Sequence, residues 1–567
     1  MSSAQAAQSN FAHPRPWALG LLMSAFCAAT YLMARPPLFD FDGYTYLLSA
    51  LGPERLDSID HLHVLWGFIQ ILLVSLSGTA IHPPTILFQI LGIALSSAAM
   101  LIFCVLLYHS SDDPWYAASA SLFIALSPRF WYLTFQNEPY PKLFLMLVLH
   151  LLAWNTSDMR APTGWRLLLS ALCLSTAILV HQAAIFLVPP GTLALIFFAN
   201  GTWKRRLVRA MIWTAGIALV VLSVYLYTWS VVAPEVRFFS WTIADLTNQH
   251  PLELPVAATV FRSMIGAFGS IVQDQDIRAF LDRQLSPSQV FAVYGAAGAA
   301  LGVAGVWLLR RSEASRIVLR LLRTNGLFMI SVLSILFWSS IVVLYEPVTQ
   351  NYWLVDMFPA AVCFGLLLRE RDWKGLPTLA TALIAISVLN LWLNHHNDME
   401  SSLNAPEHLL ASIDQHVCKE DRFIVLANHD WYGDVEYELL FEYLRVSSDP
   451  RGIAILNDFL LPASGSSAWR TQLRDKIDST LDSCHHVFLA QNVLDPSSYK
   501  DLAGTKDAFS PFVNKEYVGL DEAELFNEVK NAFEPYVLED SELDIGADHY
   551  LTVRYRGDYG GSRAGCS

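Results

Sequence analysis

Long apolar segments recur through the first two thirds of this chain and constrain its fold more than any other feature. A helix needs about 20 apolar residues to cross a bilayer core of about 30 Å. We place such segments at residues 16–34, 85–108, 115–130, 141–154, 166–187, 191–200, 210–232, 288–309, 327–345, 353–368 and 377–393. Only 16% of the residues are charged, whereas soluble domains usually have about a quarter. The sequence therefore predicts a mainly α, polytopic membrane bundle of about 11 spans.

Acidic residues are concentrated in the last third of the chain. From residue 396 onward, 31 Asp and Glu stand against 14 Lys and Arg, a net charge of −17, while the preceding residues carry +3. A segment this acidic, with few long apolar runs, is typical of a water-soluble domain. We therefore predict a membrane domain over residues 1–395 and a soluble domain over residues 396–567. No basic stripe remains that would favour nucleic acid as a partner.

The soluble part has the pattern of an α/β domain. Residues 422–427 and 486–490 are short apolar runs bounded by polar residues, as in buried parallel strands. Helical-looking stretches follow or separate them. Cys418 and Cys484 each lie a few residues before one of these runs. Neighbouring strands would bring the two thiols within disulfide range in an oxidising compartment, and the sequence leaves this pairing open.

Basic loops predict the orientation of the chain in the membrane. A further apolar run, residues 64–76, is shorter than a span, and we interpret it as a helix in the membrane interface. The basic clusters at residues 204–206, 310–323 and 369–371 then fall on one side. Excess Lys and Arg marks the cytoplasmic side, so the N-terminus is predicted inside and the acidic domain outside. The first apolar segment is interpreted as an uncleaved anchor.

Two acidic residues, Asp40 and Asp42, follow the first apolar segment and fall on the predicted outer side. In an extended segment both carboxylates point to one face, and Phe39 and Phe41 point to the other. Carboxylates at the mouth of a membrane helix are costly to desolvate, which makes the pair a candidate functional site. The alternative is a solvated loop with aromatic anchors in the interface.

Further polar residues fall on the same predicted side, namely His61, His63, Arg129, Glu138 and Lys142. Arg129 and Lys142 lie near the outer boundary, where cations either neutralise a phosphate or simply extend toward water. The two histidines are too few to hold a metal ion unless carboxylates from elsewhere complete the ligand set.

The order of these features resembles the GT-C class of membrane glycosyltransferases, which use polyprenyl-phosphate-linked sugars. Residues 41–47, Phe-Asp-Gly-Tyr-Thr-Tyr-Leu, are similar to the acidic first-loop motif of that class. Residues 60–66 are similar to the start of its juxtamembrane helix in protein O-mannosyltransferase and aminoarabinose transferase relatives, although two prolines are missing. The Leu-Ser-Pro at residues 126–128 and the loop containing Glu138 also fit. The resemblance covers the predicted membrane domain, and the soluble domain resembles no family that we identify.

The resemblance implies that a first-loop aspartate is the catalytic base. It deprotonates the acceptor hydroxyl, which attacks C1 of the sugar while the lipid phosphate leaves. Asp42 is the expected base because Gly43 and Tyr44 follow it as in the motif, and Asp40 is the second candidate. Glu138 is the implied second-loop carboxylate, which either orients the acceptor or holds a divalent ion such as Mg²⁺ or Mn²⁺.

The resemblance also implies the binding residues and the partners. Arg129 and Lys142 are the candidate phosphate ligands, and His61, His63 and Tyr44 are expected to line the donor or acceptor side. The implied partners are a polyprenyl-phosphate sugar donor, membrane lipid, and a glycan, lipid or protein acceptor. We expect a bacterial inner membrane protein with its soluble domain in the periplasm.

Two other classes of function compete with a glycosyltransferase. A multi-pass transporter or flippase, for a lipid-linked or small polar substrate, would use ionisable residues deep within several spans. The charges of this chain are expected to collect at span ends and loops instead. A non-catalytic assembly or receptor protein would bind a partner through the acidic domain and tolerate changes at Asp40 and Asp42.

Overall fold

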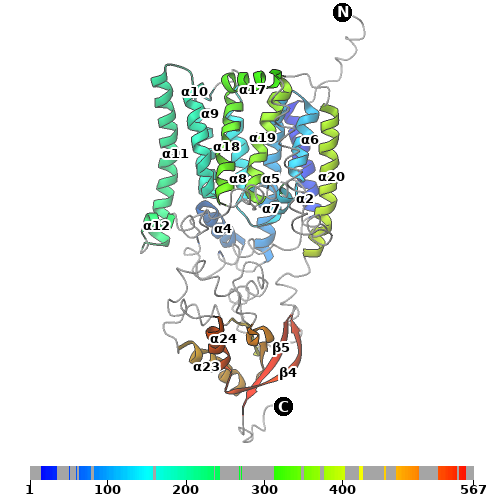
Figure 1. The fold of residues 1–567 in the computed structure, drawn as a ribbon, viewed down its shortest axis with the longest axis vertical. Helices are drawn as coiled ribbons and strands as arrows, with labels where there is room; N and C mark the ends of the chain where they lie inside the picture. The colour runs from blue at the N-terminus through cyan, green and yellow to red at the C-terminus, as the bar shows by residue number, and fades with distance from the viewer. Residues whose placement is uncertain are drawn as a thin grey trace, which may run out of the picture. The chain divides into compact units, whose positions relative to one another are not determined.

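The structure is a computed structural model whose described residues form two compact units. Besides Ala50, Ile59, Ala267 and Ser270, it describes residues 15–34, 63–77, 82–156, 161–234, 237–242, 312–345, 350–370, 376–401, 420–425, 452–454, 468–496, 522–545 and 548–556. We call the unit that contains α2 to α20 the helical unit. We call the unit that contains the strands the C-terminal unit (Figure 1).

The helical unit is built from long apolar helices joined by short connections. Its helices are α2 (Pro16–Met33), α4 (Val64–Ser77), α5 (His82–Ser111), α6 (Pro114–Ala125), α7 (Pro128–Phe135), α8 (Tyr140–Trp154), α9 (Trp165–Val180), η2 (Gln182–Leu187), α10 (Val188–Phe198), α11 (Trp203–Val232), α12 (Phe238–Thr242), α17 (Ser312–Thr324), α18 (Gly326–Tyr345), α19 (Gln350–Arg369) and α20 (Leu376–Ser401). Six of the described helices are long and apolar enough to cross a membrane: α2, α5, α11, α18, α19 and α20. The chain is therefore an integral membrane protein. The predicted count of about 11 spans stays a prediction, and the expected span at 288–309 lies outside the described residues.

The prediction that residues 115–130 form one helix is wrong. Helix α6 ends at Ala125, and α7 begins at Pro128. Proline has no N–H to continue a helix, and it disfavours helical geometry in the residue before it. Ser127 is accordingly extended, with ψ of 145°. The chain therefore continues as two separate helices, α6 and α7, in place of one.

The expected span over residues 166–187 is also divided. Helix α9 ends at Val180, and His181 is extended, with φ of −150°, before the chain continues as the 3-10 helix η2. The Nδ1 atom of His181 accepts a hydrogen bond from the Ala183 N–H at 3.3 Å. The imidazole thus satisfies one of the N–H groups that the first turn of a helix leaves open.

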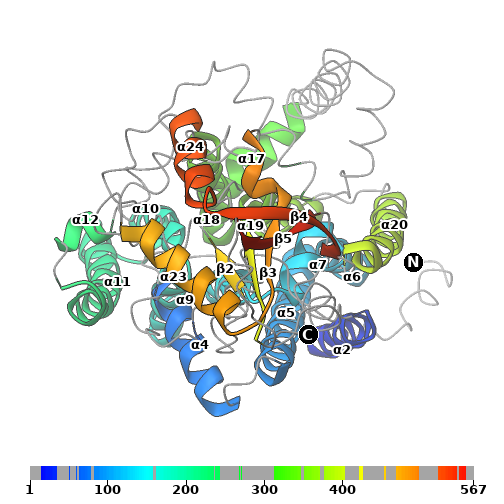
Figure 2. The same ribbon diagram turned by 90° about the horizontal axis from the view of Figure 1, so that it is seen from below.

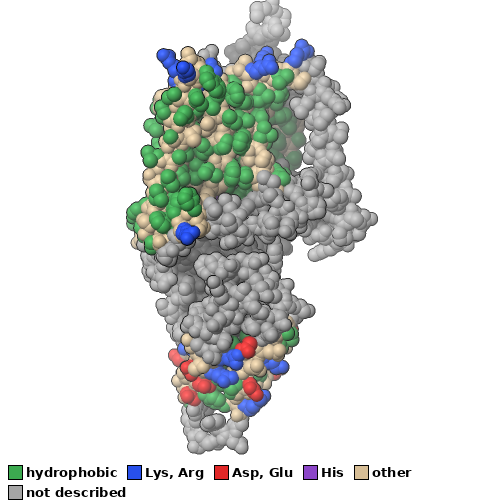
Figure 3. All heavy atoms as spheres, turned by 60° about the vertical axis from the view of Figure 1, so that its left-hand side comes forward, with side chains coloured by type: hydrophobic (Ala, Val, Ile, Leu, Met, Phe, Trp, Pro, Cys, Tyr) green, Lys and Arg blue, Asp and Glu red, His purple; other side chains and the backbone are tan. Residues whose placement is uncertain are grey.

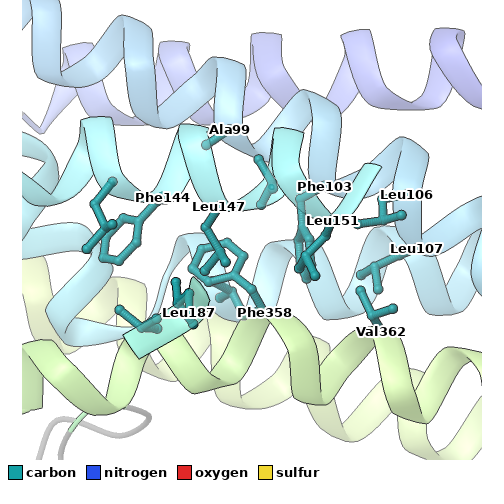
Figure 4. Close-up of a cluster of buried hydrophobic side chains, with 14 of the residues drawn as sticks. Ala99, Phe103, Leu106, Leu107, Phe144, Leu147, Leu151, Leu187, Phe358 and Val362 are labelled. Atoms are coloured by element: carbon teal, nitrogen blue, oxygen red, sulfur yellow. The ribbon is translucent and has the colours of Figure 1, made fainter. Parts of the chain in front are cut away.

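Helix α5 lies at the centre of the helical unit and packs against α2, α6, α8 and α19. Figure 4 shows Phe103 of α5, Leu147 of α8 and Phe358 of α19 meeting in one apolar cluster. The ring centroids of Phe103 and Phe358 are 5.0 Å apart in an edge-to-face pair, a geometry that adds about 0.5–1.5 kcal/mol beyond apolar burial. Gly92 allows α5 to approach α7, since a Cβ there would lie 2.3 Å from the Thr134 carbonyl oxygen.

Charge distinguishes the two ends of the helical unit. Figure 3 shows an apolar band with Lys and Arg side chains gathered mainly at one end, where α11 begins and α17 lies. We call this the basic end. Helices α4 and α7 lie toward the opposite end (Figure 1). Most basic residues of the described helical ranges therefore share one end, as the loop pattern predicts, whereas Arg129, Lys142 and Arg237 do not.

The C-terminal unit contains a mixed five-stranded sheet, part of which is visible in Figure 2. Its elements are β1 (Arg422–Val425), β2 (Gly452–Ala454), α23 (Ala468–Asp482), β3 (Val487–Ala490), η5 (Gln491–Leu494), α24 (Glu522–Ala532), β4 (Tyr536–Ile545) and β5 (Asp548–Tyr555). The strand order is β2-β1-β3-β5-β4. The two strands expected from the sequence are β1 and β3, and they pair in parallel, whereas β5 is antiparallel to both β3 and β4.

Cys484 lies just before β3 and is disulfide-bonded. Its partner is not among the described residues. The four described cysteines of the helical unit, Cys27, Cys104, Cys173 and Cys363, are free and buried. Cys418, the expected partner, lies outside the described ranges, so its pairing with Cys484 stays a prediction.

Candidate functional site

The predicted site residues fall into two groups. Asp40, Asp42, Tyr44 and His61 lie outside the described residues. The other four are described. His63 immediately precedes α4, and the remaining three, Arg129, Glu138 and Lys142, lie on the segment that runs from α7 into α8.

The turn between α7 and α8 is buried, although it is strongly polar. Asn137 is 0% exposed and Glu138 is 4% exposed. Trp66 Nε1 donates to the Asn137 carbonyl at 3.3 Å, and Gln70 Nε2 donates to Asn137 Oδ1 at 3.3 Å. Trp66 and Gln70 are four residues apart, so they project from one face of α4. Helix α4 therefore fixes the turn that carries Glu138.

Lys142 lies deeper than the sequence suggests. Its side chain is buried, its Nζ donates to the Glu138 carbonyl at 2.6 Å, and the same atom lies 3.2 Å from the centroid of the Trp66 ring. A cation over an aromatic face is attracted by the ring quadrupole, most strongly where water is excluded. The indole thus covers the Lys142 amine, which the sequence places at the outer boundary.

His63 belongs to a group of aromatic and imidazole rings beside the starts of α4 and α8. Its ring centroid is 5.0 Å from that of His181, and the His181 ring lies 5.2 Å from Tyr140 and 5.7 Å from Tyr352. His181 Nε2 and the Tyr140 hydroxyl are 3.3 Å apart. Because His181 Nδ1 accepts from the backbone, the proton of the neutral ring is on Nε2, which donates to Tyr140.

These two sets of contacts share the start of α4 and the start of α8, and we call them together the α4–α8 cluster: His63, Trp66, Gln70, Asn137, Glu138, Tyr140, Lys142, His181 and Tyr352. It contains three of the four predicted residues that are described. Arg129 makes a different contact, because its guanidinium carbon lies 4.8 Å above the ring of Tyr132 on its own helix.

Several members of this cluster are absent from the sequence-based prediction. Trp66, Tyr140, His181 and Tyr352 meet only in the fold, since they come from α4, α8, the α9–η2 junction and α19. Trp66 ends the motif at residues 60–66, and Tyr140 follows the loop that contains Glu138, but nothing in the sequence indicates that their rings meet those of His181 and Tyr352. The break at His181, which places its ring toward Tyr140, has no glycine or proline signal in the adjoining residues.

The described residues contain no group of three or more His, Cys, Asp or Glu side chains that fits a metal ion. Asp40, Asp42 and His61 lie outside these residues, so the divalent cation that the sequence leaves open stays a prediction.

Two ionisable residues lie inside helices, where the sequence predicts few. His150 of α8 is buried, with its Nδ1 3.1 Å from Ser170 Oγ. Asp356 of α19 is also buried, and Ser339 Oγ donates to its Oδ2 at 2.6 Å. Asp356 Oδ1 has no hydrogen-bond partner among the described residues.

No protein-family model and no curated protein sequence matches this chain. Among solved structures, an oligosaccharyltransferase from Archaeoglobus fulgidus, in complex with Zn and sulfate, is 13% identical. The match covers 93% of this chain and 72% of that chain, with a TM-score of 0.44. ArnT from Cupriavidus metallidurans, bound to undecaprenyl phosphate, is 11% identical, with 94% and 97% of the two chains covered and a TM-score of 0.48. Both are GT-C glycosyltransferases.

Proposed function

We propose that this protein is an integral membrane glycosyltransferase that moves a sugar from a polyprenyl-phosphate donor to an acceptor hydroxyl. The acceptor is a glycan, lipid or protein. One observation carries the proposal beyond the sequence resemblance. Glu138, Lys142 and His63 are buried in one polar cluster, in a unit whose helices are otherwise largely apolar. Burying polar and charged groups costs free energy, so a cluster of them marks a functional site.

In the proposed reaction, the Asp42 carboxylate takes the proton of the acceptor hydroxyl. The acceptor oxygen forms a bond to C1 of the sugar, and the bond between C1 and the phosphate oxygen breaks. The lipid phosphate leaves with the bonding electron pair. Asp40 is the alternative base, and general-base catalysis of this kind contributes about 10²–10⁴-fold in rate.

The cluster supplies the groups that the departing phosphate needs. Lys142 is held by the Glu138 carbonyl and by Trp66. A preorganised cation in a water-poor site stabilises developing negative charge without reorienting solvent. Arg129 is the second proposed phosphate ligand, and the Glu138 carboxylate is proposed to orient the acceptor. Tyr44, His61 and His63 are proposed to line the substrate path.

The orientation proposed here follows from charge. Excess Lys and Arg marks the cytoplasmic side, so the basic end is proposed to face the cytoplasm. The α4–α8 cluster and residues 396–567 then face the other side. In a bacterial inner membrane that side is the periplasm. Transfer from a lipid-linked sugar there requires no sugar nucleotide as donor.

Replacement of Asp42 by Asn tests the proposed mechanism. The purified variant in proteoliposomes is expected to lose transfer of radiolabelled sugar from a polyprenyl-phosphate donor by about 10²-fold or more. Its elution and thermal unfolding should match those of the wild type. Asp40→Asn is the matched control, with a smaller expected loss. Full transfer by the Asp42 variant would remove this residue from the mechanism.

A transporter is the second candidate function, and Asp356 is the observation that favours it. A buried carboxylate with one oxygen unpartnered among the described residues is typical of ion or proton pathways. Asp356→Asn separates the two functions. Loss of solute uptake with sugar transfer intact would support transport, and unchanged uptake would remove the argument from Asp356.

A further inference from the structure

A groove of about 690 Å³ lies between α9 and α11 and begins at the basic end of the helical unit. Helix α11 lines it with a stripe that runs from Lys204 to Gly216, and α9 contributes Leu168 and Ala171 among others. We call it the α9–α11 groove. The twelve steps from Lys204 to Gly216, at a rise of 1.5 Å each, give the stripe a length of about 18 Å.

The groove changes from charged to apolar along its length. Lys204, Arg205 and Arg209 lie in the first two turns of α11, and Ile212 and Gly216 follow toward the other end. Both α9 and α11 start at the basic end, so the cations of α11 lie beside the start of α9 (Figure 1). None of the lining residues is acidic. A ligand matched to this surface carries negative charge at one end and an apolar chain at the other.

Two buried N–H groups of the groove have no hydrogen-bond partner among the described residues. Arg209 Nη1 is buried and makes no hydrogen bond there, and the same holds for Nε1 of Trp213, which also lines the groove. The neighbouring Arg206 differs, since its Nε and Nη1 donate to the carbonyls of Gly201 and Phe197, each at 3.0 Å. A buried N–H without an acceptor costs about 1–3 kcal/mol. An anion at this position would remove that cost.

The groove also has room for a ligand and faces an apolar surface. A Cβ added at Gly216 would meet no atom within 4 Å. Beyond the groove, α11 exposes large apolar side chains, including Leu219 at 69% and Leu222 at 48%. Figure 3 shows this apolar surface below the basic side chains. This surface is suited to contact with the hydrocarbon core of a membrane, and a lipid acyl chain can enter the groove from it.

We propose that the α9–α11 groove binds one anionic phospholipid of the surrounding membrane. Its phosphate would contact Lys204, Arg205 and Arg209, and one acyl chain would lie against Ile212 and Gly216. Charge complementarity selects an anionic headgroup, and the apolar half of the groove selects a lipid over free phosphate. The groove starts at the end opposite α4 and shares no residue with the α4–α8 cluster, so this inference does not depend on the proposed transferase activity.

Lipid retention by the purified full-length chain tests the proposal. Protein mixed with equal amounts of phosphatidylglycerol and phosphatidylcholine is analysed by native mass spectrometry, and its thermal unfolding midpoint is measured with each lipid alone. The wild type should retain phosphatidylglycerol preferentially and unfold at a higher temperature with it. A variant with Lys204→Gln, Arg205→Gln and Arg209→Gln should lose this preference at least about tenfold.

Two single changes separate the charged half of the groove from the apolar half. Gly216→Leu should reduce retention of both lipids by filling the space beyond Ile212. Arg209→Gln should reduce phosphatidylglycerol retention, whereas Arg206→Gln removes the same charge one turn away and should leave it within about twofold. These single variants still carry the test if the triple variant does not fold.

Three outcomes would overturn the proposal. The first is wild-type retention by both Arg209→Gln and Gly216→Leu. The second is equal retention of the two lipids by the wild type. The third is an equal shift of the unfolding midpoint by inorganic phosphate and by phosphatidylglycerol, which would make the groove a free-anion site.

Discussion

The α4–α8 cluster and the α9–α11 groove both place cations within an apolar bundle, but they treat those cations differently. Lys142 is held by a carbonyl and an aromatic face from its own chain. Arg209 has a buried nitrogen with no acceptor among the described residues. A cation that the fold itself partners has a fixed position and can act repeatedly on a passing substrate. A cation left without a partner favours a ligand that stays bound.

The largest expected effect on stability is in the α4–α8 cluster, where the fold itself holds Lys142. Trp66→Ala removes a fully buried side chain, its hydrogen bond to Asn137 and the aromatic face over Lys142. Large-to-small changes of this type cost about 3–5 kcal/mol of stability. Thermal unfolding in detergent should therefore show a marked fall in midpoint.

Trp115→Ala is the matched control for this change, because Trp115 is 71% exposed on the surface of the helical unit. Its expected cost is within about 0.5 kcal/mol. Equal falls in the two midpoints would mean that Trp66 does not hold the α7–α8 turn.

Lys142→Met is expected to lower sugar transfer more than it lowers stability. The change leaves the Glu138 carbonyl without its donor, at a cost of about 1–3 kcal/mol, and it removes the proposed phosphate ligand. Loss of one such electrostatic contact typically lowers kcat by about 10²–10³-fold. The measurements are kcat in proteoliposomes and the unfolding midpoint of the same preparation.

Arg209→Gln is the control for Lys142→Met in the measurement of kcat, because it removes a positive charge from the α9–α11 groove and leaves the α4–α8 cluster unchanged. In vesicles of phosphatidylcholine alone, it should leave transfer unchanged. A kcat for Lys142→Met equal to that of Arg209→Gln would show that the partnered cation has no role in the reaction.

The sequence predicts the helices of this protein better than it predicts their contacts. Apolar length alone locates α2, α5, α18, α19 and α20, and α19 stays continuous although Pro359 lies inside it. The break before Pro128 carries a readable signal in the proline itself. The break at His181 carries none, since its geometry depends on contacts with other segments.

The position of Lys142 could not be predicted for the same reason. A lysine near the start of an apolar run normally extends toward the interface. Here Trp66, from a helix 76 positions earlier in the chain, lies over its ammonium group. Contacts of this kind depend on tertiary packing, which periodicity and composition do not encode.

Tyr140→Phe has the smallest expected effect and tests whether the His181 break serves the cluster. The change keeps the ring and removes only the hydroxyl that accepts from His181 Nε2. A single hydrogen bond contributes about 0.5–1.5 kcal/mol, so the unfolding midpoint should fall slightly. Tyr227→Phe, at a tyrosine that is 63% exposed, should leave it unchanged.

If the hydrogen bond also sets the orientation of His181, and through ring contact that of His63, the KM for the donor should rise while kcat changes little. A fall in midpoint without any change in KM would make this pair a packing contact only, and would restrict the functional part of the cluster to Trp66, Glu138 and Lys142.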